Sequence, residues 1–445
     1  MSSAHTIFAL ASAPGQAGVA LFRISGPQAR QAIESLCLPA TLPAPRQAAL
    51  RILKHPKSDE PIDRTLTLYF AAPHSFTGED VVEFHTHGGR AVTNAVIQAL
   101  SLLPNFRMAE PGEFTRRAFE NGKMDLTEAE AIADLVHAET EAQRKQALRQ
   151  LDGALGQLYE NWRLRLSRGL AYMEAAIDFS DEELPADMIE KQSAALRELR
   201  QSIARHLNDN RRGERLREGF SIAILGPPNA GKSSLLNALA QRDAAIVSPT
   251  AGTTRDIIEV HLDIGGYPVT LADTAGLRES ADAIESEGVR RAHARAAQAD
   301  LTIFLFDGAV WPQKDQVTES LISPGSLIVV NKSDLFDSAT TSGPGELFIS
   351  VRTQAGLDRL MEKLAQEIGQ HLAASASEAP PLTRARHRTA LEECVSHLDR
   401  ALSAAMADLR AEDVRLAMRA LGRITGRVDV EDLLDIIFRD FCIGK

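Results

Sequence analysis

A phosphate-binding loop is the feature of this sequence that most constrains its fold. Residues 226–233 read GPPNAGKS and match the pattern GxxxxGK[ST]. The loop follows a strand-like apolar run, FSIAIL, and leads into a helix-like run, SLLNALA. In this context backbone amides cradle phosphates, Lys232 reaches the β- and γ-phosphate oxygens, and Ser233 holds Mg²⁺. The alternative is a glycine-rich turn that carries a surface lysine.

Two further loops, each at the end of an apolar run, weaken that alternative. Asp273-Thr-Ala-Gly276 supplies an acid for the water shell of the metal and a glycine amide near the γ-phosphate. In Asn331-Lys332-Ser-Asp334, the carboxylate of Asp334 can accept from both N1–H and the 2-amino group of guanine. Their order and spacing predict a site for GTP.

A fourth loop and the stem of Lys332 complete this interpretation. The stem of Lys332 covers the base, and adenine lacks the donor pair that Asp334 reads. Ser350-Val-Arg352 is a loose version of the last guanine loop and carries little weight alone.

Bulk properties exclude several other classes. A chain of 445 residues predicts two or three domains. A net charge of −11 argues against nucleic-acid binding through overall charge, although a local basic face stays open. Three cysteines without a CxxC pair indicate a reducing compartment. We find no signal peptide and no apolar run of about 18 residues, so we expect a cytoplasmic protein of bacterial type.

Hydrophobic periodicity divides the chain into regions with three kinds of secondary-structure pattern. Residues 1–119 mix strand-like runs at 19–24, 65–70 and 81–84 with a helix at 92–103. Helical stripes follow at 148–177, 196–207, 391–409, 414–424 and 430–441. Between them, strand-like runs lie at 220–225, 261–264, 268–272, 301–306, 326–330 and 346–350. Each apolar stripe must be buried against another apolar surface. The sequence therefore predicts one helical bundle into which an α/β domain is inserted.

Five more segments make a resemblance specific. They are GTTRD at 252–256, SFTGEDVVEFHTHGG at 75–89, EPGEFTRRAF at 110–119, LTRARH at 382–387 and the terminal CIGK. Together with the guanine loops they resemble the MnmE (TrmE) family of tRNA modification GTPases over essentially the whole chain. Two departures are small: Pro227 stands where the family usually has arginine, and the Ser-Val-Arg loop is irregular.

The resemblance implies a multidomain α/β protein. Its parts would be an N-terminal α+β, tetrahydrofolate-binding and dimerisation domain (1–119), a discontinuous helical bundle (120–216 and 380–445) and an inserted Ras-like P-loop GTPase domain (217–379). The residues implied to bind GTP are Asn229, Ala230, Gly231, Lys232, Ser233, Ser234, Ser248, Thr253, Thr254, Asp273, Thr274, Ala275, Gly276, Asn331, Lys332, Asp334, Ser350, Val351 and Arg352.

The resemblance also implies two metal ions and a catalytic acid. Mg²⁺ would be held by Ser233 and Thr254. Leu277 occupies the position where small Ras-like GTPases carry a water-orienting glutamine, so Glu285 would position the water. Lys232 would assist catalysis at the phosphates. K⁺ would take the place of an arginine finger, with Asn229, Ser248, Thr250 and Thr253 as its ligands. By position alone, Glu285 is one of several acids in its segment.

A folate site and partner molecules are implied in the same way. Arg23, Glu83, Lys123 and Lys445 would bind 5-formyl- or methylene-tetrahydrofolate. The cations suit the glutamate tail of a folate, and the carboxylate suits its pterin ring. The family forms a homodimer through the N-terminal domain, and a heterotetramer with the FAD-dependent protein MnmG. Together they modify C5 of the wobble uridine of certain tRNAs.

Other readings remain open at this stage. A regulatory GTPase switch that binds RNA or ribosomal particles would carry the same guanine loops. His85 and His87 lack a third metal ligand, and Cys442 is either a nucleophile or a packing residue. The candidate phosphate contacts for tRNA are Arg144, Lys145, Arg149, Arg163, Arg165, Arg168, Arg384, Arg386 and Arg388, each of which also suits a solvated helix face.

Overall fold

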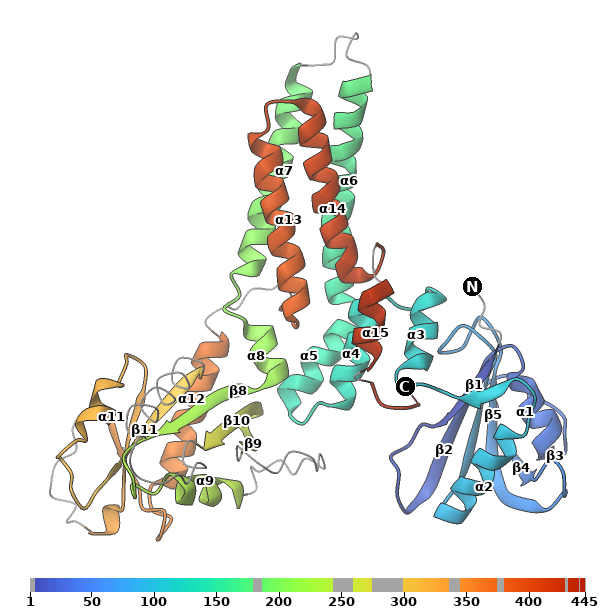
Figure 1. Ribbon diagram of the computed structural model, residues 1–445, viewed down its shortest axis with the longest axis horizontal. Helices are drawn as coiled ribbons and strands as arrows, with labels where there is room; N and C mark the ends of the chain where they lie inside the picture. The colour runs from blue at the N-terminus through green and yellow to red at the C-terminus, as the bar shows by residue number, and fades with distance from the viewer. Residues whose placement is uncertain are drawn as a thin grey trace, which may run out of the picture. The chain divides into compact units, whose positions relative to one another are not determined.

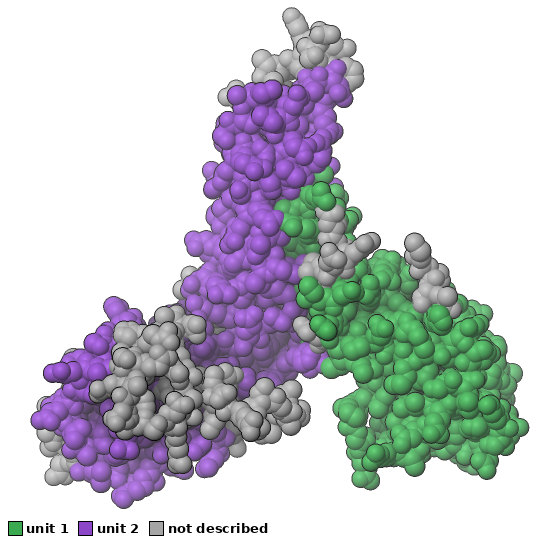
Figure 2. Space-filling view, in the orientation of Figure 1, with its two compact units in different colours: residues 1–133, 151–163, 418–445 green, residues 134–150, 164–417 purple. Residues whose placement is uncertain are grey.

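The structure, a computed structural model, describes residues 5–178, 186–242, 259–273, 299–335, 345–373, 380–428, 431–439 and 441–444. The chain forms two compact units (Figure 2). Unit 1 comprises residues 1–133, 151–163 and 418–445, and unit 2 comprises residues 134–150 and 164–417. None of the helices in these ranges is long and apolar enough to cross a membrane.

Unit 1 is built on a seven-stranded sheet (Figure 1). The strands are β1 (Thr6–Leu10), β2 (Ala17–Ser25), β3 (Cys37–Leu38), β4 (Ala49–Lys54), β5 (Pro61–Phe70), β6 (Val81–Gly88) and β7 (Phe106–Met108), in the order β3-β4-β5-β6-β2-β1-β7. Alternate residues such as Phe8, Phe22 and Phe84 point to one face. Helices α1 (Ala29–Leu36) and α2 (Arg90–Ser101) bury their apolar sides in the same core. The expected α+β character of this region is confirmed.

The C-terminal end of the chain belongs to unit 1. Helix α15 (Glu431–Arg439) packs Leu434 and Phe438 against Leu126 of α4 (Leu126–Val136). Beyond it, Gly444 lies against the end of β1, because a Cβ atom there would stand 2.7 Å from the carbonyl oxygen of Leu10. Its φ of +98° also favours glycine.

Unit 2 contains a six-stranded sheet. Its strands are β8 (Phe220–Leu225), β9 (Glu259–Ile264), β10 (Tyr267–Asp273), β11 (Leu301–Asp307), β12 (Leu327–Asn331) and β13 (Glu346–Phe348), in the order β13-β12-β11-β8-β10-β9. All pairs are parallel except β9 with β10. Chain order reverses direction at β8, and ligands bind parallel sheets at the carboxyl ends of strands near such a point.

The long helices that precede and follow the six-stranded sheet in the sequence differ from the predicted stripes in two places. The single helix expected over 148–177 is wrong, because α5 (Glu141–Leu151) ends before α6 (Ala154–Asp178) begins. Gly153 between them has a φ of +83°, which no helix tolerates. The stripe over 391–409 is also interrupted, since α13 (Ala385–Ser403) ends before α14 (Ala407–Thr425). Met406 is therefore 60 % exposed rather than buried.

Helices that precede the six-stranded sheet in the sequence pack against helices that follow it, as the discontinuous bundle requires. Helix α7 (Ala186–Leu207) lies beside α13 (Figure 1). The two connections to the sheet are also tied together, because one oxygen of Asp134 accepts from Arg217 at 3.0 Å and from Arg384 at 2.8 Å. Arg217 lies in α8 (Arg212–Glu218), which leads into β8, and Arg384 precedes α13. The four domain ranges given above stay predictions.

Candidate guanine-nucleotide site

The phosphate-binding loop lies between β8 and α9 (Lys232–Ala240), as predicted. Its backbone needs glycine at two places. A Cβ on Gly226 would stand 2.1 Å from the carbonyl oxygen of Leu305, and one on Gly231 would stand 2.4 Å from Nδ2 of Asn331. The ammonium group of Lys232 donates to the carbonyl oxygens of Gly226 and Pro227, at 2.8 and 3.0 Å. The loop is therefore closed around the lysine that the phosphates are expected to attract.

Asn331, in the loop at 331–334, joins the phosphate-binding loop to the loop at 350–352. Its side-chain amide donates to the carbonyl of Ala230 at 2.9 Å, and its oxygen accepts from the N–H of Val351 at 3.1 Å. The side chain is almost fully buried. Both contacts are therefore shielded from water, where an unmade hydrogen bond costs most.

The carboxylate of Asp334, which the sequence predicts to read the base, is held from two sides. Ser350 donates from Oγ to Oδ1 of Asp334 at 2.6 Å, and Arg352 pairs with Oδ2 at 2.9 Å. The hydrogen bond from Ser350 is the main reason why the pKa of Asp334 lies below its ordinary value. The group is thus an ionised acceptor at neutral pH, and each oxygen keeps a lone pair for a base.

A cavity of about 830 Å³ brings the predicted residues together. Its lining residues are Pro228, Asn229, Gly231, Lys232, Ser233, Ser234, Asn331, Lys332, Asp334, Leu335, Ser350, Val351 and Arg352. Asp273 ends β10, which pairs with β8 at Ile224. Of the remaining predicted residues, Ser248, Thr250, Thr253, Thr254, Thr274, Ala275, Gly276 and Glu285 lie outside the described residues.

The sequence interpretation missed three residues of this region. Pro228 and Leu335 line the cavity, and Asp307 contacts Lys332. The signal for Asp307 was present, since it ends an apolar run in the same way as Asp273 and Asn331. Ends of parallel strands share one edge of a sheet.

A second predicted site lies in unit 1. Arg23 and Glu83 face one another across β2 and β6 and form an ion pair at 3.0 Å. Arg23 also lies over the ring of Phe76, 5.3 Å from its centre. Lys123 donates to the carbonyl of Pro73, at 3.0 Å, and so contacts the same β5–β6 loop. Three of the four folate candidates are thus placed around one segment, and Lys445 lies outside the described residues.

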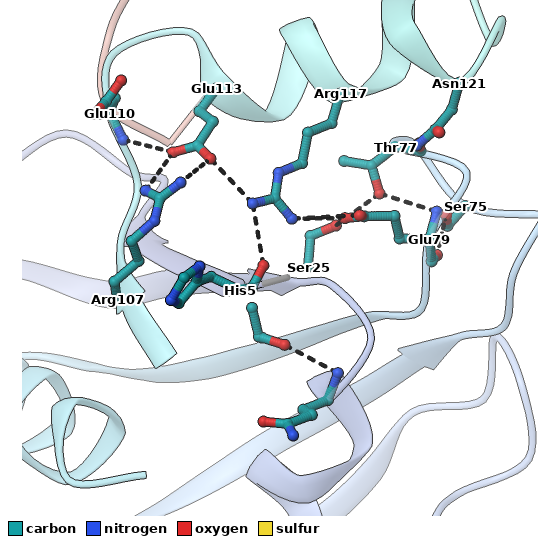
Figure 3. Close-up of polar contacts among 12 residues, drawn as sticks. His5, Ser25, Ser75, Thr77, Glu79, Arg107, Glu110, Glu113, Arg117 and Asn121 are labelled. Carbon is teal, nitrogen blue, oxygen red and sulfur yellow. Dashed lines mark hydrogen bonds and ion pairs between the residues drawn. The ribbon is translucent and has the colours of Figure 1, made fainter. Parts of the chain in front are cut away.

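A buried polar network supports that loop (Figure 3). Arg117 of α3 (Glu113–Glu120) lies between Glu79 and Glu113, at 3.0 Å from each carboxylate. Glu79 also accepts from Ser25 at 2.7 Å. Because only 5 % of the Arg117 side chain is exposed, the two carboxylates compensate for the removal of its charge from water. The network gives a structural role to Glu79, which lies in the segment 75–89, and to Glu113 and Arg117, which lie in the segment 110–119.

Among the described residues, neither His85 nor His87 lies in a group of three potential metal ligands. His87 instead lies 2.8 Å from Asp63, and His85 lies 3.6 Å from Glu83. Among the cysteines, Cys442 is exposed, whereas burial raises the pKa of Cys37 to about 12.

Most of the basic residues considered for tRNA are engaged with carboxylates. Arg384 pairs with Asp134, and Arg388 pairs with Asp209 and Glu214. Pairs to acidic neighbours are also formed by Arg144, Lys145, Arg163 and Arg165. Arg149 and Arg168 are exposed and have no such pair among the described residues.

The fold and the cavity define the class of this protein. A phosphate-binding loop at the carboxyl end of the central strand, joined by a buried asparagine to an aspartate that suits guanine, is the site of a P-loop GTPase. Two family models match: "GTP-binding protein TrmE N-terminus" over residues 6–123 and "MnmE helical domain" over residues 126–442.

Full-length relatives agree with these models. "tRNA modification GTPase MnmE" of Parvibaculum lavamentivorans is 58% identical, over 99% of this chain and 100% of its own. The protein of the same name from Paramagnetospirillum magneticum is 54% identical over the same shares. The human protein "5-taurinomethyluridine-[tRNA] synthase subunit GTPB3, mitochondrial" is 47% identical, over 100% of this chain and 94% of its own. The chain belongs to the MnmE family of tRNA modification GTPases.

Proposed function

We propose that this GTPase hydrolyses GTP in a K⁺-dependent manner during modification of the wobble uridine of certain tRNAs in the cytoplasm. With an FAD-dependent partner, MnmG, it installs an aminomethyl or carboxymethylaminomethyl group at C5, and the carbon comes from a tetrahydrofolate. The observation that carries the proposal is the cavity in which Lys232, Ser233 and Asp334 come together. The names of the relatives supply the link to tRNA.

Each part of the cavity has a role in binding. The phosphates lie over the loop ahead of α9, where backbone amides and the ammonium of Lys232 neutralise their charge. Ser233 at the start of α9 supplies a hydroxyl oxygen, a ligand that suits Mg²⁺. Asp334 accepts from guanine while the stem of Lys332 covers the ring. Thr254, Asp273 and Gly276 complete the phosphate side.

Hydrolysis depends on residues beyond the described ranges. Glu285 positions the attacking water, since Leu277 cannot. K⁺ is held by Asn229, Ser248, Thr250 and Thr253, and its charge serves the purpose of an arginine finger. Asn229 supports this role because it lines the cavity beside the phosphate loop and has a φ of +64°.

Tetrahydrofolate binds beside β2 and β6 in the proposal, between Arg23, Glu83, Lys123 and Lys445. Arg23 and Glu83 offer opposite charges on adjacent strands. The tail supports the fourth position, because Gly444 lies against Leu10 in β1, the strand next to β2. Two copies of the chain associate through the N-terminal domain and assemble with MnmG into a heterotetramer.

Nucleoside analysis of tRNA from a deletion strain tests the function. We expect unmodified wobble uridine in that strain, and restoration by the wild-type chain but not by Glu285→Ala. Unchanged nucleosides in the deletion strain would instead favour a regulatory GTPase switch that binds RNA or ribosomal particles. Binding of a reduced folate, measured by titration, would be independent evidence against the regulatory switch.

A further inference from the structure

A carboxylate outside the cavity contacts the lysine that covers the proposed base position. Oδ2 of Asp307 lies 2.6 Å from Nζ of Lys332. Lys332 lines the cavity, whereas Asp307 is not among the described lining residues. The carboxylate therefore acts on the ammonium end of the lysine, away from the space that a base would fill.

The main chain fixes Asp307 in this position. It is the last residue of β11 and lies opposite Asn331, the last residue of β12. The N–H of Ala309 donates to its Oδ1 at 3.0 Å, so the second oxygen is directed to Lys332. The N–H of Gly308 donates to the carbonyl of Asn331 at 2.8 Å and ties the two loop starts together. The acceptor is thus in place before any ligand arrives.

The charge of Asp307 is also maintained. Burial raises the pKa of Asp307, but hydrogen bonds from Lys332 and from the N–H of Ala309 lower it by more. The carboxylate is consequently ionised at neutral pH. The lysine side chain, 34 % exposed, is held by one charged partner at its far end.

Stability alone does not explain this ion pair. β11 and β12 are already joined by a ladder from Ile303 to Asp307. A partly exposed ion pair adds little to the free energy of folding. An unrestrained lysine stem, in contrast, samples many rotamers and loses them when it packs on a ligand. Lys332 also has a φ of +63°, so its backbone is committed to one conformation as well.

We propose that Asp307 is a positioning residue for guanine, which holds Lys332 extended along the base plane before the nucleotide binds. It acts through Lys332 and touches no part of the nucleotide itself. The inference rests on the proposed guanine site. It assigns a role in base binding to the end of β11, which lies outside the four loops predicted to bind GTP.

The test uses Asp307→Asn in the full-length chain, with GDP and inosine diphosphate as probes in isothermal titration. Asparagine keeps the acceptor for Ala309 but removes the charge that attracts Lys332. We expect both dissociation constants to rise by the same factor, about three- to tenfold, from one side chain that must now be ordered on binding. Asp315→Asn is the matched control, because Asp315 caps α11 (Gln316–Ser320) outside the cavity lining.

A double-mutant cycle separates positioning from a general structural effect. Lys332→Met keeps an unbranched stem without the charge, so adding Asp307→Asn to it should cause no further loss of GDP affinity. Additive losses, or a dissociation constant within twofold of wild type, would overturn the inference. So would a fall in the melting temperature of the nucleotide-free protein with unchanged affinity. Failure of the wild-type chain to bind GDP would instead remove the proposed guanine site itself.

Discussion

The side-chain amide of Asn331 donates to the carbonyl of Ala230, across 101 positions of sequence. The same side chain accepts from the N–H of Val351, so one residue holds the phosphate loop and the last guanine loop in a fixed relation. We expect Asn331→Ala to weaken GDP and GTP alike, by about tenfold to a hundredfold, since two buried groups lose their partner. Titration of both nucleotides measures this. Asn237→Ala, an exposed change in α9, is the control and should bind normally.

Base choice should depend on Asp334. The variant Asp334→Asn presents an amide that can donate, so we expect it to lose GTP affinity and to gain affinity for xanthosine triphosphate. Loss of a charge-assisted hydrogen bond costs about 1.5–3 kcal/mol, or about tenfold to a hundredfold in affinity. Competition between the two nucleotides measures the preference. A variant that still prefers GTP would show that another loop reads the base.

Hydrolysis is expected to require K⁺, with Na⁺ a poor substitute because the smaller ion fits the loop oxygens badly. Glu285→Ala should keep near-normal GTP binding while kcat falls by about two orders of magnitude or more. Phosphate release in K⁺ and in Na⁺ buffers tests both statements. Full turnover in Na⁺ alone would refute the K⁺ assignment, and an unchanged rate for the variant would transfer the role to a different acid.

The proposed folate site makes a prediction about the two ends of the chain. Deletion of Cys442 to Lys445 and the variant Arg23→Ala should each weaken 5-formyltetrahydrofolate binding and leave GTP affinity unchanged. The reason is that Gly444 lies against Leu10, one strand away from Arg23. Isothermal titration of the folate compares the variants with wild type. Equal affinity in all three proteins would contradict the assignment of this site.

Arg388 is expected to stabilise the fold rather than to bind phosphate. It donates to Glu214 at 2.9 Å and to Asp209 at 2.6 Å, and the side chain of Glu214 is only 2 % exposed. In Arg388→Met we expect a loss of about 3 kcal/mol in unfolding free energy, the lower end for a buried pair, because Arg211 still contacts Glu214. Urea unfolding at pH 7 measures this, with the exposed Arg149→Met as control.

The acid sensitivity of the same variant follows from the pKa of Glu214. Burial raises that pKa, and the hydrogen bonds from Arg211 and Arg388 lower it by more. A depressed carboxylate contributes stability above its unfolded pKa of about 4.3 and loses it as the pH falls through the lower folded value. Without Arg388 the pKa of Glu214 rises, so acid unfolding should begin at a higher pH. An unchanged acid midpoint would show that Arg388 does not set the charge of Glu214.

The loops that line the cavity were predictable because their signals are local. The glycines at 226 and 231 are required by close backbone approaches, and a residue pattern of eight positions reveals them. Helical stripes also predicted that helices before residue 217 pack against helices after residue 383, as α7 and α13 do. The break at Gly153 was missed, because apolar spacing continues across two helices that are separated by Asp152 and the left-handed Gly153.

Charge pairing was decided by the tertiary structure. Arg388 and Glu214 are 174 residues apart in sequence, and Arg384 and Asp134 are 250 apart. Nothing near these arginines in the chain distinguishes them from Arg149, which stays exposed. The sequence by itself determined which nucleotide chemistry the loops suit, since a phosphate loop is defined by its own backbone. Only the fold decided which basic side chains remain available to other partners. A basic side chain is neutralised when packing brings a carboxylate close to it, and that carboxylate can lie far away in the sequence.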